Sequence, residues 1–568
     1  MRYLSIFFLV IFISSLIFIG CSQKSSISEK IDRGLIALPK DRGIVYVGWR
    51  QLSSDPNDIG FNVYRMEIGK NEYEKVNDEP ILNSTNYVDR EVVPGNAYRY
   101  KVKTVINGKE EETRGSAYVF AFPWNKPYIS ILFQGDYMVQ NLAIADLDGD
   151  GKYDYVIKQP AFNTDPWREP GYWRRSKEPY KLEAYSSDGK FMWRYSMGWA
   201  IETGMWYSPY IVYDIDGDGF AEVYAKAGEG DPRELDGHVL EGPEYLVKID
   251  GRTGKIVDKI NWLSRDGFEN YNYFSRNFLT VAYLNGKEPS LIMQRGTYTI
   301  IKTSAYDDNM NQVWYWEASN SDEKYRGQGQ HGLISADIDG DGRDELVIGS
   351  AVIDDNGKAL WTTGLGHPDV GYVADIDPER PGPEIFYGIE PRRNSNAVCL
   401  VSAVDGKILW GYDGPTKHVH GQGMAADIDP NYPGMECYAG EQDGSQFWLY
   451  SADGERISDK SFGTLSPRAV WWDADPQKEI VTNKKLFKYN GDTLIEIEGR
   501  VIAIADCLGD WREEILTSIN GELRIYSTTI PSETRRVCLM QDRQYRIGVV
   551  AASMGYYYPP QLGGNTMP

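Results

Sequence analysis

The stretch Asp337-Ile338-Asp339-Gly340-Asp341-Gly342-Arg343-Asp344-Glu345 decides the fold of this chain. Aspartates occupy its first, third and fifth positions and Glu345 its ninth, and the two glycines allow a sharp turn between them. Several carboxylate oxygens brought together in one short loop are the ligands that a hard Ca²⁺ ion prefers. Because short apolar runs precede and follow the loop, the pattern predicts a metal-bound hairpin rather than a helix-flanked EF-hand.

The acidic loop recurs along the chain. Six further copies, two complete and four altered, begin at Asp146, Asp214, Asp375, Asp427, Asp473 and Asp506. An eighth unit without the acids is predicted at residues 281–286, and the spacing of roughly thirty to seventy residues brackets that of propeller blades. The Ca²⁺ ligands predicted from five of these loops are Asp146, Asp148, Asp150, Asp154, Asp214, Asp216, Asp218, Glu222, Asp337, Asp339, Asp341, Glu345, Asp375, Asp377, Glu384, Asp427, Asp429 and Glu436.

A second signature accompanies the loops. Turns such as Asp188-Gly189 and Asp405-Gly406 separate β-rich runs and are typical of hairpins. A strand, an acidic loop, a second strand, a tight turn and a further strand together make one propeller blade. The sequence therefore predicts an all-β protein, a propeller of about eight blades with Ca²⁺ in its Asp-x-Asp-x-Asp-Gly loops.

The beginning of the chain is a targeting segment. Arg2 precedes an apolar run that ends at Cys21, and a small residue followed by cysteine is typical of a bacterial lipoprotein cleavage site. We predict a signal peptide over residues 1–21, lipidation of Cys21 and a polar tether over residues 22–33. An ordinary signal peptide followed by an unrelated cysteine is the alternative. We expect an exported protein that is anchored by lipid in a bacterial envelope.

Residues 34–122 differ from the rest of the chain, because their short alternating strands carry no acidic loops. Trp49 on an early strand and the pair Tyr98 and Tyr100 on a late one are typical of a small fibronectin type III-like sandwich. We interpret this part as a structural spacer. Residues 123–568 are then the propeller domain, which we expect to be catalytic.

Composition limits the classes of partner. The chain has 568 residues and a formal net charge of −22, which argues against binding to nucleic acid. Much of the acid lies in the loops where Ca²⁺ would neutralise it, so the charge says little about the substrate. Five cysteines in so long a chain do not indicate a disulfide scaffold. We expect a monomer that contacts a membrane only through its lipid anchor.

Histidines mark one edge of the predicted propeller. Of the five in the chain, four precede acidic loops at a similar distance, namely His331, His367, His418 and His420. One histidine at such a position usually makes a hydrogen bond in the core, but four in one register favour a function, because this register would line the mouth of the central channel. Residues that share the register in other units are Gln140, Asn141, Tyr207, Arg276, Arg468 and Arg500.

A basic channel mouth in an acidic protein favours an acidic polysaccharide as partner. We predict His331, His367, His420, Arg468 and Arg500 as catalytic residues, and two chemistries fit them. In the first, an arginine or a cation neutralises a uronate carboxylate, a histidine removes the proton beside it, and the sugar substituent leaves by β-elimination. In the second, two histidines and an acid hold a metal ion that neutralises the carboxylate. The sequence leaves both open.

A run of motifs resembles the family 11 polysaccharide lyases, the rhamnogalacturonan lyases, over roughly residues 34–563. The matching stretches include Gly135 to Tyr137, Trp361 to His367, Gly423 to Pro430, Gly509 to Glu514 and Met540 to Arg546. The resemblance implies β-elimination on a rhamnose–uronate polysaccharide, with Ca²⁺ ions that stabilise the fold and assist at the site. It also implies that His331 and His367 are the two histidines that such enzymes place at the channel.

Three departures from the family pattern concern its substrate site. The family's Asn-Asn-Gly-Thr-Lys loop is replaced by residues 495–501, and Gln422 stands where the family has arginine. The family's Ala-Asn-Asp before the first metal loop is Val139-Gln140-Asn141 here. We expect Gln140, Asn141, Tyr207, Arg276, His418 and Gln422 to bind substrate. A divergent lyase fits this pattern, acting on a rhamnogalacturonan-like polymer or on the sulfated algal polysaccharide ulvan. A non-catalytic surface lipoprotein that binds acidic polysaccharide is the alternative.

Overall fold

The computed structural model describes residues 29–121, 128–167, 173–318, 320–482 and 484–563. The predicted signal peptide, Cys21 and most of the predicted tether lie outside these residues. The described chain is built almost wholly of antiparallel strands, which confirms the all-β class predicted from the sequence. None of the helices in these ranges has the length and apolar character needed to cross a bilayer.

Two sheets precede the acidic repeats. Residues Trp49, Phe61 and Tyr100 are fully buried between them, because inward and outward side chains alternate along each strand. The first sheet contains β1 (Ile36–Asp41), β2 (Ile44–Gly48) and β5 (Asn86–Asp89). The second contains β3 (Gly60–Glu67), β4 (Glu74–Lys75), β6 (Ala97–Ile106), β7 (Lys109–Glu112) and β8 (Ala117–Phe120).

Eight four-stranded antiparallel sheets come next within the described residues. The first four sheets contain β10 (Asn141–Ala145), β11 (Asp154–Gln159), β12 (Lys181–Tyr185) and β13 (Phe191–Ser196); β14 (Tyr210–Tyr213), β15 (Glu222–Gly228), β16 (Glu244–Ile249) and β17 (Ile256–Asn261); β18 (Asn277–Ala282), β19 (Ser290–Arg295), β20 (Lys302–Tyr306) and β21 (Gln312–Glu317); and β22 (Gly329–Ala336), β23 (Glu345–Gly349), β24 (Ala351–Ile353) and β25 (Ala359–Thr362). The next four contain β26 (Pro368–Ala374), β27 (Glu384–Ile389), β28 (Val398–Ser402) and β29 (Ile408–Gly411); β30 (Met424–Ala426), β31 (Glu436–Gly440), β32 (Phe447–Tyr450) and β33 (Arg456–Ser458); β34 (Arg468–Val470), β35 (Glu479–Val481), β36 (Lys485–Phe487) and β37 (Thr493–Glu496); and β38 (Arg500–Ala505), β39 (Glu514–Ile519), β40 (Glu522–Tyr526) and β9 (Tyr128–Leu132).

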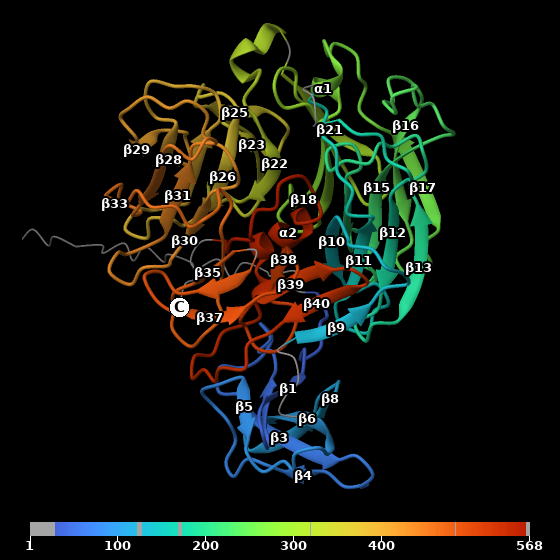
Figure 1. Ribbon diagram of the computed structural model, residues 1–568, viewed down its shortest axis with the longest axis vertical. Helices are drawn as coiled ribbons and strands as arrows, with labels where there is room; N and C mark the ends of the chain where they lie inside the picture. The colour runs from blue at the N-terminus through green and yellow to red at the C-terminus, as the bar shows by residue number, and fades with distance from the viewer. Residues whose placement is uncertain (1–28, 122–127, 168–172, 319, 483, 564–568) are drawn as a thin grey trace, which may run out of the picture.

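Every acidic loop joins the first strand of one of these sheets to the second, and so does the loop after residue 282 that lacks the acids. From β10 to β34 each first strand packs against the next, β38 packs against β10, and these strands are almost wholly buried. The last sheet is completed by β9, which precedes all the others in the chain and pairs with β40. Two distant parts of the chain are therefore joined in one sheet, and the sheets surround a common centre (Figure 1).

A helix that the sequence analysis did not predict lies at this centre (Figure 1). The helix α2 (Arg543–Ala551) is capped by the Asp542 carboxylate, which accepts a hydrogen bond from Tyr545 N at 2.8 Å. It contacts the first strands β10, β14, β18, β22 and β38. The shorter α1 (Tyr271–Phe274) and the 3₁₀ segments η1 (Asn320–Tyr325) and η2 (Leu539–Gln541) lie in loops.

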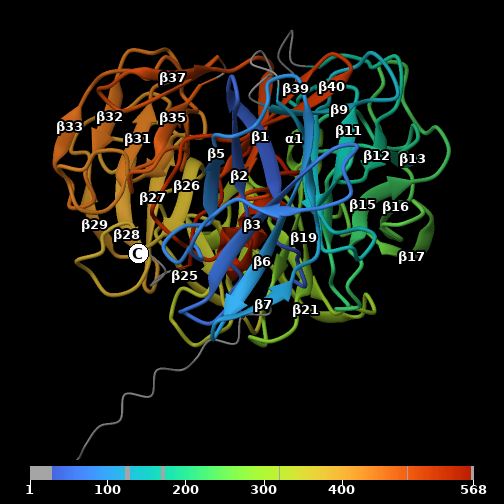
Figure 2. The same cartoon turned by 90° about the horizontal axis from the view of Figure 1, so that it is seen from below.

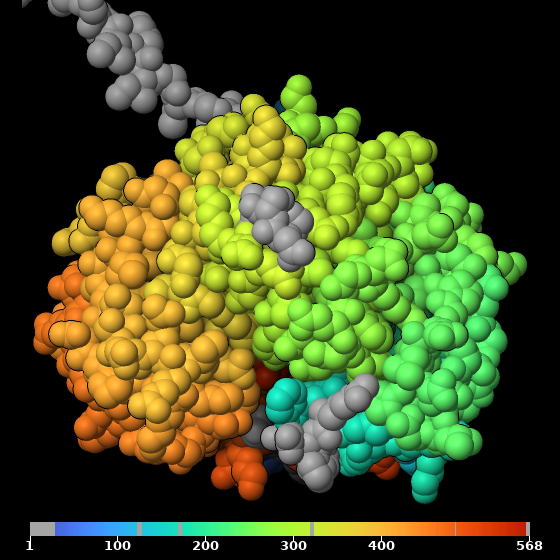
Figure 3. Space-filling view, turned by 90° about the horizontal axis from the view of Figure 1, so that it is seen from above, coloured from blue at the N-terminus to red at the C-terminus, as the bar shows by residue number. Residues whose placement is uncertain are grey.

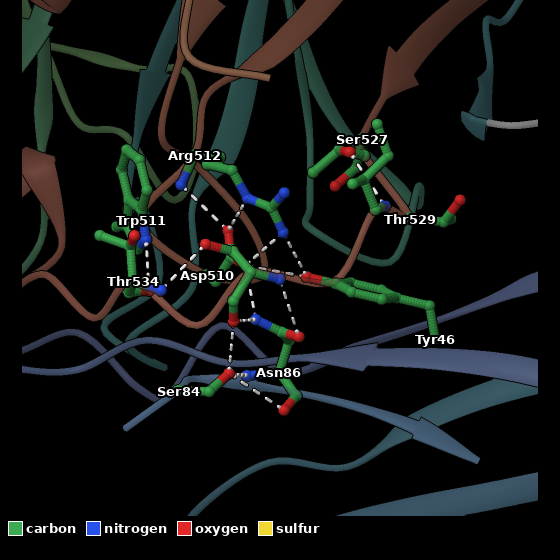
Figure 4. A network of polar contacts seen from close by, with 12 residues as sticks. Tyr46, Ser84, Asn86, Asp510, Trp511, Arg512, Ser527, Thr529 and Thr534 are labelled. Atoms are coloured by element: carbon green, nitrogen blue, oxygen red, sulfur yellow. Dashed lines mark hydrogen bonds and ion pairs between the residues drawn. The ribbon is translucent and has the colours of Figure 1, made fainter. Parts of the chain in front are cut away.

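A buried polar network joins the N-terminal sheets to the last four-stranded sheet (Figure 4). Tyr46 OH donates to Asp510 Oδ2 at 2.8 Å and accepts from Arg512 Nη2 at 2.9 Å. Arg512 in turn lies 2.7 Å from Asp510. All three side chains are buried, so this network fixes how the N-terminal sheets sit below the larger set (Figure 1), in front of which they lie in the view from below (Figure 2).

Candidate functional site

Four of the five histidines meet at one place, as their shared register predicts. His331 lies in β22, His367 directly precedes β26, and His418 and His420 lie just before β30. Asp369, in β26, is fully buried at the centre of the group. His331 and His367 point their Nε2 atoms at Asp369 Oδ1, at 3.7 and 3.5 Å, and His420 Nδ1 lies 2.5 Å from Asp369 Oδ2.

A second carboxylate, Glu390, repeats this arrangement at the outer side of the group. Its Oε2 lies 3.3 Å from His367 Nε2 and its Oε1 lies 3.0 Å from His418 Nε2. The sequence analysis missed both acids. Asp369 could have been found, because it comes two positions after His367 on a strand and therefore faces the same side. Glu390 carries no such signal, since it directly succeeds the next strand, β27.

Ion-pair contacts rather than regular hydrogen bonds connect the histidine cluster, as we call His331, His367, His418 and His420 with Asp369 and Glu390. Buried atoms that make no hydrogen bond within the described structure are His331 Nδ1, His367 Nε2, His418 Nε2, His420 Nδ1 and both Asp369 carboxylate oxygens. Burial, with His367 and Arg276 nearby, lowers the pKa of His331 well below its usual value. Ligand-type atoms of His331, His367 and Asp369 lie close enough together to hold one divalent cation.

One further side chain faces the cluster and was also missed. Tyr298 OH lies 2.9 Å from His331 Nε2, and its ring centre is 4.6 Å from that of His367. Burial raises the pKa of Tyr298 above its usual range, so its hydroxyl keeps its proton at neutral pH. Arg276 stacks on the Tyr298 ring at 5.4 Å and pairs with Asp165 at 3.0 Å.

Two residues predicted to bind substrate, Tyr207 and Arg276, are buried beneath the surface of the site. Arg276 is 3% exposed, and Tyr207 is 1% exposed and packs against Trp173 and Tyr271. Burial of this degree leaves their side chains no surface for a sugar in this structure. Both therefore occupy supporting positions, and a direct substrate contact stays a prediction.

The two predicted arginines form a separate group. Arg500 donates to Gln140 O at 2.8 Å and Arg468 donates to Val501 O at 3.1 Å, so part of each guanidinium ties neighbouring sheets together. Arg468 also stacks on Tyr557 at 5.0 Å. Nearby amide oxygens of Gln140 and Asn141 are buried and unpartnered. No contact places these arginines on the histidine cluster within the described residues, and their catalytic role stays a prediction.

The C-terminal segment lies against the histidine cluster. Tyr556 lies against His331 with ring centres 5.0 Å apart, and the Tyr558 hydroxyl donates to the Asp369 carbonyl. Seen from above, the molecule is hollowed between the segments coloured orange and cyan, and dark red C-terminal atoms show inside the hollow (Figure 3). Gln422 is half-buried just beyond His420 in the chain, and its backbone N–H donates to Ser466 Oγ at 3.0 Å. Its predicted contact with substrate stays a prediction.

The acidic loops bring several carboxylates close together. In the fourth sheet Gly340 N and Gly342 N donate to the two oxygens of Asp337 at 2.9 and 3.1 Å, which gathers the loop around its carboxylates. Burial raises the pKa of Glu345 to about 8, because the crowded carboxylates lack a counter-charge. Carboxylate groups close enough to share one ion occur at Asp146, Asp148 and Asp154, at Asp214, Asp216 and Asp218, and at Asp337, Asp339 and Glu345.

In the other loops, some carboxylates lack a hydrogen bond and others already pair with a lysine. In the fifth and sixth sheets Asp375 Oδ1, Asp427 Oδ1 and Glu436 Oε1 are buried without a hydrogen bond, which fits a bound cation. In the second sheet Lys248 Nζ already lies 2.9 Å from Asp216 and 3.1 Å from Glu222. A lysine thus shares the second loop with any metal ion that binds there.

Comparisons with known proteins match nearly the whole chain. The family model described as "Rhamnogalacturonan lyase family 11, C-terminal domain" matches residues 132–565, and "Rhamnogalacturonan I lyases beta-sheet domain" matches residues 26–120. Rhamnogalacturonan endolyase YesW of Bacillus subtilis is 37% identical over 94% of this chain and 90% of its own length. Rhamnogalacturonan exolyase YesX of the same organism is 33% identical over 94% of both chains.

Solved structures agree. The YesW structure has a TM-score of 0.85 at 34% identity, over 94% of this chain and 96% of that one. The YesX structure has a TM-score of 0.86 at 31% identity, over 95% and 97%. A rhamnogalacturonan lyase of Bacillus licheniformis has a TM-score of 0.85 at 33% identity, over 94% and 96%.

Proposed function

This chain belongs to rhamnogalacturonan lyase family 11 and is a polysaccharide lyase, and from that premise we propose that it cleaves a rhamnose–uronate polysaccharide by β-elimination at the histidine cluster. The observation that carries the proposal is the convergence of four histidines and two acids, drawn from three neighbouring sheets, beside the C-terminal segment. The choice of substrate rests on the relatives' names and on the family match.

The geometry favours the second of the two chemistries, in which histidines and acids hold a metal ion. A cation held at Asp369 and His367 would neutralise a uronate carboxylate and lower the energy of the carbanion that forms beside it. His367 Nδ1 contacts the Gly329 carbonyl, which leaves His367 Nε2 to face Asp369 and Glu390 as a metal-ligating nitrogen would.

The hydrogen-bonded pair Tyr298 and His331 is suited to the proton transfers. In the elimination, the C5–H bond of the uronate breaks, a C4=C5 double bond forms, the C4–O bond breaks and the departing oxygen takes up a proton. Neutral His331 can take up the C5 proton, while Tyr298, which keeps its proton at neutral pH, donates that proton to the departing oxygen. The proton on His331 then returns to the Tyr298 phenolate through their hydrogen bond, so the net transfer is from C5 to the leaving oxygen. We place Arg468 and Arg500 beside the acid groups of the bound polymer.

We also propose that the eight sheets are blades of a propeller, that the acidic loops bind Ca²⁺ and that Cys21 carries a lipid anchor. Contacts between successive first strands and the pairing of β9 with β40 support the propeller. Unpartnered carboxylate oxygens support the ions. The sequence motif around Cys21 supports the anchor and a position in a bacterial envelope.

Incubation with rhamnogalacturonan, ulvan and polygalacturonate, each monitored by the absorbance of unsaturated uronate products, tests the function. Asp369→Asn should remove the activity, whereas His238→Ala, which changes the one histidine outside the cluster, should leave it. Activity on rhamnogalacturonan alone would mean that the protein shares the substrate named for its relatives. Activity on ulvan alone would mean that it is a divergent lyase with ulvan as its substrate. Binding without product on any polymer would instead favour a non-catalytic surface protein and contradict the proposal.

A further inference from the structure

We propose that His418 and His420, with one oxygen each of Asp369 and Glu390, form a separate binding site for a divalent transition-metal ion such as Zn²⁺. This position lies on the outer side of the two carboxylates, whereas His331 and His367 face their inner side. The inference concerns the same region as the proposed function but rests on metal-binding geometry, so each can fail without the other.

The backbone places both histidines on one side. Residues 418–420 are extended, and Val419 forms an isolated antiparallel bridge with Glu441. The Val419 side chain is fully buried in the core, and successive side chains of an extended segment alternate. His418 and His420 must therefore both point away from that core, toward the carboxylates.

This extended segment is held in place before any ion binds. The Glu441 carboxylate accepts hydrogen bonds from Lys417 N at 2.8 Å and His418 N at 2.7 Å, and His420 N donates to Gly440 O at 3.0 Å. Three bonds to the neighbouring strand thus fix the backbone that carries the two imidazoles. A ligand pair built on fixed backbone loses little conformational entropy when it binds an ion.

Each carboxylate divides its oxygens between the two histidine pairs. Asp369 turns Oδ1 to His331 and His367 and Oδ2 to His420, which lies 2.5 Å away. Glu390 turns Oε2 to His367 at 3.3 Å and Oε1 to His418 at 3.0 Å. The outer position therefore has two imidazole nitrogens and two carboxylate oxygens, all within 4.8 Å of one another.

These atoms are close enough to share one ion. His420 Nδ1 lies 2.5 Å from Asp369 Oδ2 and His418 Nε2 lies 3.0 Å from Glu390 Oε1, in ion-pair contacts without regular hydrogen-bond geometry. Ligands of one tetrahedral Zn²⁺ ion stand about 3.3 Å apart, so the observed separations need shifts of under about 1 Å to admit it.

The mixture of donors selects the class of metal. Two imidazoles with two carboxylates suit Zn²⁺ and its neighbours, whereas Ca²⁺ takes oxygen ligands as in the acidic loops. The His418 and His420 side chains are 37% and 30% exposed, while His331 and His367 are nearly buried. The outer position is therefore open to exchange with ions in solution.

Calorimetric titration with Zn²⁺ of the purified, chelator-treated full chain, in excess Ca²⁺, tests the site. We expect the His418→Gln/His420→Gln double variant to bind one Zn²⁺ fewer than wild type, or to bind it at least about 100-fold more weakly, more than loss of a supporting contact costs. His238→Gln is the matched control, because that half-buried histidine also lies beside a single aspartate and should leave the stoichiometry unchanged.

Substitution with Co²⁺ gives an independent readout, since its visible spectrum reports nitrogen ligands and should be lost from the double variant. Equal Zn²⁺ binding by wild type and double variant, or displacement of the ion by excess Ca²⁺, would overturn the proposal. If Zn²⁺ binds as expected and no polysaccharide is cleaved, the proposed function fails and the metal site stands. If the double variant does not fold, the same Zn²⁺ titration is made with His418→Gln and His420→Gln as separate single variants.

Discussion

The ammonium group of Lys488 lies 2.5 Å from the Asp473 carboxylate, inside the acidic loop of the seventh sheet. The same nitrogen pairs with Asp475 and lies 3.9 Å from Glu479, the other acids of that loop. A side chain of the protein thus supplies the positive charge that other loops leave to a metal ion. The loops share one sequence pattern but differ in their counter-charges.

Lys488→Met should make the seventh loop dependent on Ca²⁺. Three carboxylates would lose their counter-charge, and we expect a loss of about 1–3 kcal/mol, below the value for a fully buried pair because the lysine is 37% exposed. Added Ca²⁺ should restore part of the melting temperature. Lys485→Met, a change at an exposed residue of the strand just before Lys488, is the control. A variant that melts like wild type, with the same Ca²⁺ response, would contradict this prediction.

Chelation should lower the melting temperature of the wild-type protein, since a ligand that binds only the folded state adds about 2.7 kcal/mol at a hundredfold excess over its Kd. Asp337→Ala should remove a larger share of this Ca²⁺-dependent stabilisation than Asp214→Ala. The reason is that Lys248 already neutralises part of the second loop. Thermal melts of both variants at fixed Ca²⁺ compare them directly, and equal losses would show that Lys248 does not compete.

Tyr298→Phe should slow the lyase reaction by about 10²–10⁴-fold, the usual contribution of a general acid, without weakening metal binding. The variant keeps the ring that contacts His367 and removes only the hydroxyl beside His331. Steady-state kinetics on the active polymer, with metal content measured in parallel, checks this. A wild-type kcat would exclude the phenol from the proton transfers.

Asp510→Asn should destabilise the junction between the N-terminal sheets and the last sheet by about 3–5 kcal/mol, because the buried Arg512 guanidinium would lose its charged partner. Tyr46→Phe should cost only about 1 kcal/mol, the net value of a typical hydrogen bond. Chemical denaturation of the two variants measures the difference. The reverse order of stabilities would mean that the tyrosine, not the ion pair, holds the junction.

Cys21→Ser should move the protein from the membrane fraction to the soluble fraction of the exporting cell, because the thiol is the predicted site of the lipid. Fractionation and subsequent detection of the chain measure this, with wild type processed in parallel. Membrane association that survives the substitution would sink the lipoprotein prediction.

Much of the architecture could be predicted from the sequence because it is written locally. The residues that define each acidic loop lie only a few positions apart in the sequence. Each loop joins the buried first strand of a sheet to its second strand, and so does the loop after residue 282, which has lost its acids. The common register of His331, His367 and His420 before such loops was enough to expect their meeting, since repeated units place equivalent positions around one centre.

What only the tertiary structure decided depends on segments that are distant in the chain. Glu390 and Tyr298 contact the histidine cluster although they come from other segments of the chain. Lys488 pairs with the acidic loop of the strand pair that precedes it, and α2 packs against the first strands at the centre of the sheets. No periodic pattern marks such residues, because their partners are set by how the sheets pack and not by spacing. The sequence by itself therefore determined the repeating scaffold and the meeting of the histidines, whereas packing decided which acids, phenol and cations lie beside them.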